Sequence, residues 1–166
     1  CAGDGERLDL LEAALALSAL RHDDAVDLAP YRLHVAAMSA DLADLVRRRG
    51  ASPESLAEVL AQSYAYRGDS ETYDDLQNAD LARVIERRQG LPVALSILYL
   101  HVARGQGWTS EGLAFPGHFL IRVEIDGARH VIDPFHDGCV RDAADLRDLL
   151  RQVLGSTAEL RPAHFD

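Results

Sequence analysis

His118 and Asp133 are the two side chains whose types and spacing best suit joint chemistry. The dipeptide Asp126-Gly127 is a strong signal for a two-residue hairpin turn. Continued along both strands, that register makes Asp133 a diagonal neighbour of His118 on one face of the hairpin. A carboxylate near an imidazole fixes its tautomer and raises its basicity. If the pair is catalytic, His118 would be the general base and Asp133 its orienter, because an even-length turn keeps both on one face.

Ser96 and Cys139 are the side chains that could supply a nucleophile to this pair. Ser96 lies one turn inside a predicted helix that begins at Pro92. A serine in an apolar helix more often hydrogen-bonds to the helix backbone, so a packing role is the alternative. Cys139 follows Asp133 by six residues in a turn-like segment and could equally be a small, partly buried residue. An isolated His/Asp pair on a hairpin is more often structural than catalytic.

A metal site is a further possibility, because imidazole, carboxylate and thiolate groups are common metal ligands. The most plausible ligand set is His118, Asp133 and His136. The predicted register points His130 to the opposite face, and the chain contains no C-x-x-C or H-E-x-x-H spacing. We therefore expect neither a resident metal nor another cofactor.

The elements that must position these groups are helical first and then stranded. Apolar spacing, prolines at helix starts and glycines at helix ends predict helices over about 8–20, 30–49, 53–64, 78–88, 92–104 and 142–154. Beyond Gly107 the apolar period changes to two, which predicts a hairpin over about 119–133. The fold class is α+β, with one domain over 1–166. Its helical N-terminal part covers about 1–64, and its core covers about 65–166.

Four further positions are candidates for a binding site. Tyr73 lies in the polar, acidic segment 65–77, which we expect to be a surface loop. Asn78 is expected as a helix N-cap, with a site role as the alternative. Arg87-Arg88 ends a predicted helix, where arginine compensates the helix dipole or could hold the acidic segment. Gly117 could let backbone approach a ligand, although turn geometry alone explains it.

Composition excludes several classes of function. The chain has 166 residues and a formal net charge of −10, and all of its basic residues are arginine. This charge argues against a nucleic-acid or anionic membrane partner, because both bind through cations. Two cysteines, Cys1 and Cys139, are too few for a disulfide scaffold and fit a reducing, cytoplasmic setting. Cys1 could be a lipidated or nucleophilic N-terminus, and we expect neither.

Several ordered motifs resemble the SirB-type transglutaminase-like family. They are Tyr66-Arg67-Gly68 with Tyr73, Arg87-Arg88-Gln89-Gly90-Leu91-Pro92, Phe115-Pro116-Gly117-His118-Phe119-Leu120 and Ile132-Asp133-Pro134-Phe135. The resemblance covers the chain from about residue 8 to about residue 150, which is nearly its whole length. It implies a papain-like core in which a central helix packs on an antiparallel sheet, preceded by an added helical part.

The resemblance also implies that the nucleophile of the wider superfamily is missing. In that superfamily a cysteine stands at the start of the central helix, where the helix N-terminus lowers the thiol pKa. The matching position here is Pro92, while His118 and Asp133 match the base and its orienter. Proline carries no nucleophile and removes one backbone N–H from the helix start. The thiol mechanism therefore cannot operate in its usual form.

Two hypotheses follow. The first is a catalytically degenerate domain that binds a protein partner in a remnant cleft lined by Pro92, Phe115, His118 and Asp133. The second is a hydrolase or acyltransferase of altered mechanism, with His118 as general base. In that case Ser96, Cys139 or an activated water is the attacking group.

Overall fold

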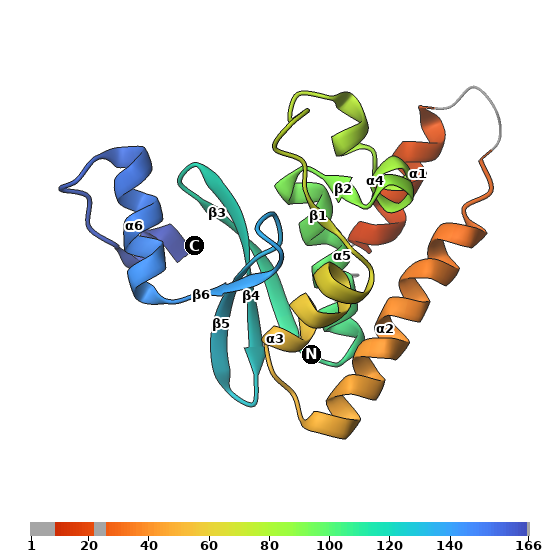
Figure 1. Ribbon diagram of the computed structural model, residues 1–166, viewed down its shortest axis with the longest axis horizontal. Helices are drawn as coiled ribbons and strands as arrows, with labels where there is room; N and C mark the ends of the chain where they lie inside the picture. Colours follow the sequence, from red (N-terminus) through yellow and green to blue (C-terminus); the bar gives the residue numbers. More distant parts are fainter. Residues whose placement is uncertain (1–8, 22–25, 166) are drawn as a thin grey trace, which may run out of the picture.

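The structure is a computed structural model that describes residues 9–21 and 26–165. Cys1 lies outside these residues. The described helices are α1 (Leu10–Leu20), α2 (Ala29–Arg49), α3 (Glu54–Ala57), α4 (Leu81–Arg87), α5 (Pro92–Gly105) and α6 (Ala143–Leu154) (Figure 1). Shorter helical turns are the π-helical η1 (Glu58–Ser63), which continues α3, and the 3-10 turns η2 (Leu76–Ala79) and η3 (Pro162–Phe165).

The local signals read from the sequence operate at these helix ends. Pro92 is the first residue of α5, where its missing N–H costs no helix hydrogen bond. Gly50 ends α2 with a φ of 89°, a conformation that suits glycine. Asp142 caps α6 by accepting hydrogen bonds from the Ala144 and Asp145 amides, and Asp145 returns a bond to the cap.

The described strands form one antiparallel sheet and one short parallel pair. The sheet has the order β3 (Thr109–Phe115), β4 (His118–Ile125), β5 (Ala128–Asp133) and β6 (Cys139–Arg141). The parallel pair joins β1 (Arg67–Gly68) to β2 (Gln89–Gly90). Between β4 and β5, Ile125 pairs with Ala128 and Glu124 pairs with Arg129. The register predicted from the two-residue turn is therefore confirmed.

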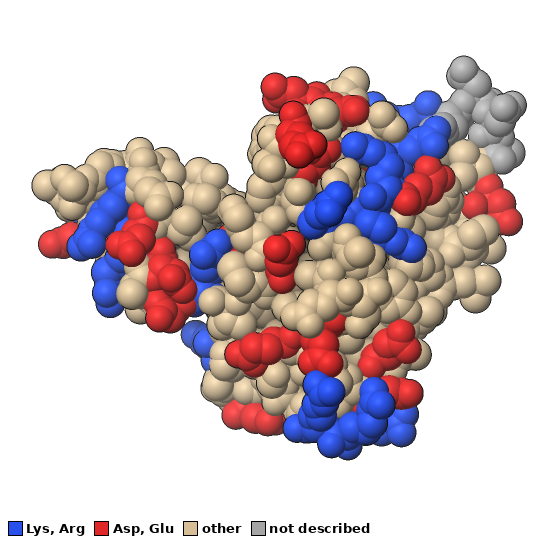
Figure 2. Space-filling view, in the orientation of Figure 1, with Lys and Arg blue, Asp and Glu red and all other residues tan. Residues whose placement is uncertain are grey.

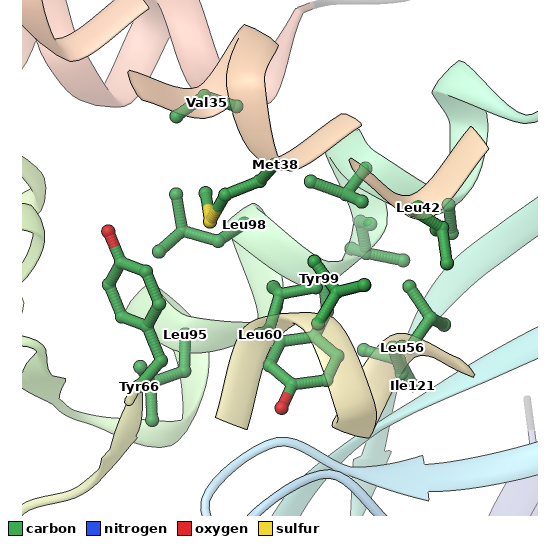
Figure 3. Close-up of a cluster of buried hydrophobic side chains, with 14 of the residues drawn as sticks. Val35, Met38, Leu42, Leu56, Leu60, Tyr66, Leu95, Leu98, Tyr99 and Ile121 are labelled. Carbon is green, nitrogen blue, oxygen red and sulfur yellow. The ribbon is translucent and has the colours of Figure 1, made fainter. Parts of the chain in front are cut away.

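The main core lies between the N-terminal helices, α5 and one face of the sheet. Figure 3 shows side chains of α2, α3, η1 and α5 converging with β4 on one cluster. On α5, Leu95, Leu98 and Tyr99 are completely buried. This all-round burial explains why the sequence of α5 shows so little polar patterning.

A second, smaller cluster covers the opposite face of the sheet. Leu120 of β4 belongs to this cluster, together with Leu146 and Leu150 of α6. Its neighbour Ile121 belongs to the main core, as the two-residue period of a strand requires. The sheet is thus held between α5 and α6, and the expected α+β fold, with a central helix on an antiparallel sheet, is confirmed.

Several local predictions were incomplete or wrong. Asn78 is not a helix N-cap, because it lies in η2, and Asp80 caps α4 through the Arg83 amide. The expected loop 65–77 contains β1 and the start of η2. Strands β3 and β6 were not predicted. In β3, Gly112 leaves room for the ring of Phe119 on the next strand, a packing that a propensity argument does not reveal.

Among the described residues, no helix is both long enough and apolar enough to cross a membrane.

Candidate functional site

A cleft of about 680 Å³ opens where the start of α5 meets one end of the sheet. Figure 2 shows the molecule indented there, between the part that carries α6 and the part that carries residues 69–79. The cleft is lined by Tyr73, Leu91, Pro92, Val93, Phe115, Gly117, His118, Phe119, Asp133, Phe135 and His136. Six candidates from the sequence therefore lie in one cleft: Tyr73, Pro92, Phe115, Gly117, His118 and Asp133.

Asp133 is the most constrained polar group of the cleft. It is 1% exposed, and its Oδ2 accepts hydrogen bonds from Arg141 Nη2 at 2.8 Å and Nε at 3.2 Å. The same oxygen lies 2.8 Å from Nδ1 of His136, which donates when Nδ1 carries the proton. The predicted orienter thus has an imidazole partner, but that partner is His136 rather than His118.

The turn after β5 explains this change of partner. The Asp133 carbonyl accepts hydrogen bonds from the amides of His136 and Gly138, at 3.2 and 2.9 Å. Asp137 and Gly138 both have positive φ, so the chain turns back sharply and brings His136 over the carboxylate. Strand β6 then places Arg141 diagonally opposite Asp133. Neither His136 as the partner nor Arg141 follows from the β4–β5 register alone.

His118 begins β4 and faces the same cleft. Its ring centroid lies 6.4 Å from that of His136. Burial lowers the pKa of His118, and the nearby Asp133 opposes this shift without cancelling it. His118 is therefore mainly uncharged at neutral pH and can accept a hydrogen bond or a proton from a ligand.

The two candidate nucleophiles lie outside the cleft lining. Ser96 is 1% exposed, and its hydroxyl donates to the Pro92 carbonyl at 2.7 Å, one turn back along α5. This is the usual local bond of a helix serine. Cys139 pairs with Asp133 in the β5–β6 register, and burial raises the pKa of its thiol. A raised pKa disfavours the thiolate that nucleophilic attack requires.

Asn78 and Arg87 hold the acidic loop, which we define as residues 69–75. Arg87 Nη1 donates to Asn78 Oδ1 at 2.9 Å, and its Nη2 lies 3.3 Å from Asp69. Asn78 is fully buried and donates to the Thr72 carbonyl at 2.7 Å. Asn78 thus fixes the loop that carries Tyr73, and it does so without lining the cleft itself.

Arg88 points away from the cleft. It adopts the left-handed conformation at the end of α4 and stacks over the ring of Tyr66, with 5.0 Å from guanidinium to ring centroid. Its Nη1 donates to the Tyr66 hydroxyl at 2.6 Å and lies 2.7 Å from His34 Nε2. Burial raises the pKa of Tyr66 to about 12, although Arg88 works in the opposite direction. We assign this cluster to the packing of β1 against α2.

Gly117 occupies the β3–β4 turn with a φ of 70°, and a Cβ built there would come within 2.6 Å of Val153. Turn geometry and the close approach of α6 both explain the glycine.

Across residues 9–21 and 26–165, no three His, Cys, Asp or Glu side chains are arranged to hold a metal ion.

Comparison with known proteins adds the family. The chain is similar to a UPF0162 protein of Xylella fastidiosa, with 35% identity over 158 residues, covering 93% of this chain and 56% of that protein. A UPF0162 protein of Vibrio cholerae is 32% identical over 169 residues, covering 99% of this chain and 62% of that protein. The chain therefore spans less than two thirds of the length of these curated relatives.

A shorter match, of 36% identity over 69 residues, links the chain to mouse F-box only protein 21, covering 42% of this chain and 11% of that protein. No solved structure matches. Residues 30–166 match the sequence model of the transglutaminase-like superfamily. Because that match covers most of the chain and all of the cleft, the chain belongs to the transglutaminase-like superfamily.

Proposed function

We propose that this domain is a catalytically degenerate, SirB-type member of its superfamily and that its cleft binds a protein partner. Pro92 would stand where catalytic relatives keep their cysteine. The observation that carries the proposal is the cleft lining, which among the described residues contains two imidazoles and a carboxylate but no cysteine, serine or threonine. A general base without a nucleophile beside it cannot form a covalent acyl intermediate.

The surroundings of Ser96 and Cys139 support the same reading. The Ser96 hydroxyl is buried and already donates to the Pro92 carbonyl. Cys139 lies outside the lining and has a raised thiol pKa. Either side chain would have to break its present packing to reach a substrate next to His118.

The character of the cleft favours a protein ligand. Its walls are largely aromatic and aliphatic, and Tyr73 and Val93 are 50% and 51% exposed at its edge. Exposed apolar side chains gathered around a concave surface are typical of binding sites. His118 and His136 would supply the directional hydrogen bonds that orient the ligand.

A second candidate is a hydrolase of altered mechanism. The observation in its favour is the 2.8 Å contact between Asp133 Oδ2 and His136 Nδ1. A carboxylate that holds one ring nitrogen leaves the other free to act as a base. In this alternative His136 or His118 would activate a water molecule for attack on a carbonyl group.

Active-site labelling separates the two candidates. The wild-type chain, His118→Ala and His136→Ala are treated with fluorophosphonate and chloroacetamide probes and with a panel of ester and amide substrates. His130→Ala is the matched control, because His130 does not line the cleft. We expect no labelling and no turnover that depends on His118 or His136. Labelling or turnover that both cleft variants abolish and His130→Ala retains would overturn the proposal.

A further inference from the structure

We propose that the cleft takes a cationic protein segment, in which an apolar or aromatic side chain enters the cleft and flanking Arg or Lys residues face the acidic loop. This inference rests on the proposed function and names its partner by chemistry. It is carried by two features that meet at Tyr73: an apolar floor and a negatively charged rim.

The floor of the cleft suits one large apolar side chain. The Phe135 ring packs edge-on against Tyr73, with 6.0 Å between ring centroids. Phe119 and Pro92 complete apolar walls around a space of about 680 Å³. A volume of several hundred Å³ accommodates a side chain together with the backbone that presents it.

The acidic loop forms the rim of the cleft, and Arg87 pairs with only one of its carboxylates among the described residues. Of the four carboxylates in the acidic loop, Asp69 points inward and binds Arg87. Glu71 and Asp74 are exposed and form no ion pair among the described residues, and Asp75 caps η2 through the Gln77 amide. Figure 2 shows acidic side chains gathered on this part of the surface, directly beside the indentation.

Among the described residues that line the cleft, none is an arginine or a lysine that would repel an incoming cation. Arg141, which binds the cleft residue Asp133, donates two hydrogen bonds to that carboxylate. Burial lowers the pKa of His118, which keeps that imidazole mainly uncharged. Glu71 and Asp74 are exposed and lie within two residues of the cleft residue Tyr73, so they add negative charge beside the cleft. The rings of Tyr73 and Phe135 add faces that attract an ammonium or guanidinium group.

Peptide binding tests the inference directly. Fluorescein-labelled nonapeptides carry a central Phe flanked by Arg, by Gln or by Glu, and a fourth peptide keeps Arg but replaces Phe with Gly. Binding to the chain is measured by fluorescence anisotropy at increasing ionic strength. We expect the Arg-Phe peptide to bind best and to weaken with salt. Removal of Phe should weaken it at least about tenfold, given the value of one buried aromatic side chain.

Two variants place the peptide in the cleft. The double variant Glu71→Gln/Asp74→Asn should weaken binding of the Arg-Phe peptide about fivefold. The control Glu54→Gln/Glu159→Gln makes the same charge change on exposed residues outside the cleft and should leave binding unchanged. Tyr73→Ala should weaken it about tenfold, and Leu33→Ala, an exposed apolar control on α2, should not.

The outcomes separate this inference from the proposed function. Equal binding of the Arg, Gln and Glu peptides, or equal effects of the two charge variants, would overturn the cationic partner and leave a neutral binding cleft. Absence of binding by every peptide overturns the inference as well. A cleft filled by a second copy of the chain would appear as a dimer in sedimentation that Tyr73→Ala dissociates, and this also overturns it. The proposed function itself falls only through labelling or turnover that depends on His118 and His136.

Discussion

Asp69 and Asp133 are both buried carboxylates that bind an arginine, at 4% and 1% exposure. Asp69 accepts its other hydrogen bonds from its own loop, namely from the amides of Glu71 and Thr72 and from the Thr72 hydroxyl. The second partner of Asp133 is His136, whose side chain is 50% exposed and lines the cleft. The same Asp–Arg pairing therefore closes a loop in one place and positions an imidazole at a cleft in the other.

The two regions are joined through one glycine. Gly68 immediately precedes Asp69, and its amide donates to the Phe135 carbonyl at 3.1 Å. Phe135 in turn precedes His136 and packs against Tyr73 of the acidic loop. The loop and the β5–β6 turn are therefore positioned against each other, and the shape of the cleft depends on both.

The largest effect should come from Asp133→Ala. The substitution leaves the guanidinium of Arg141, which is only 20% exposed, without its carboxylate. Removing one partner of a buried ion pair costs about 3–5 kcal/mol, because the remaining charge stays buried and unpaired. Urea unfolding measures this loss. The double variant Asp133→Ala/Arg141→Met should recover part of it, and a single variant as stable as the wild type would show that the pair is not buried in solution.

Gly68→Ala should separate the two regions. A Cβ at this position would come within 2.5 Å of both the Phe135 carbonyl oxygen and its ring. Because a backbone atom cannot move away as a side chain can, we expect a loss of about 2 kcal/mol. Hydrogen exchange should accelerate in the acidic loop and in the β5–β6 turn together. Acceleration confined to one of them would contradict the coupling. Gly105→Ala controls for glycine loss, because a Cβ there would meet only Ser39, at 3.6 Å.

Asp69→Asn tests the role of the Asp69 carboxylate in the acidic loop. Hydrogen bonds from Thr72 hold the pKa of Asp69 well below its usual range. A carboxyl with a depressed folded-state pKa contributes stability above its unfolded pKa, near 3.8, and this stability is lost as the pH falls further. We expect Asp69→Asn to flatten the acid side of the stability profile and to speed amide exchange in the loop about tenfold. Cleft geometry at His136, followed by its imidazole NMR signals, should change little.

The β4–β5 half of the site could be predicted from the sequence because its signals are local. Asp126-Gly127 determined the turn, the turn determined the register, and the register placed Asp133 on the face of His118. Pro92 likewise marked the start of α5. That start lies beside the same cleft, as the resemblance implied.

The other half depends on contacts that no local signal encodes. Strand β6 is only three residues long and has no clear alternation, so Arg141 could not be recognised as the partner of Asp133. Asp137-Gly138 marks a turn in the sequence, but it does not show that this turn brings His136, rather than His118, to the Asp133 carboxylate. Asn78 and Asp80 are both residue types that cap helices, and the tertiary bond from Asn78 to Thr72 decides between them.

The smallest expected effect is a shift in the pKa of His118, and its titration is the sharpest test of the region around Asp133. Burial lowers its pKa and Asp133 raises it, so the measured value shows which influence is larger. We expect the His118 signal to titrate below the usual value of about 6.5 in proton–carbon NMR spectra. A histidine whose pKa is lowered in the folded state makes the fold less stable as the pH falls through the unfolded pKa, because the unfolded chain binds the proton first.

Asp133→Asn should lower the pKa of His118 further, since it removes a neighbouring negative charge that raises it. A His118 that titrates above 6.5 in the wild type and near 6.5 in Asp133→Asn would mean that the effect of Asp133 on its pKa exceeds that of burial, and would return His118 to the role of the oriented base.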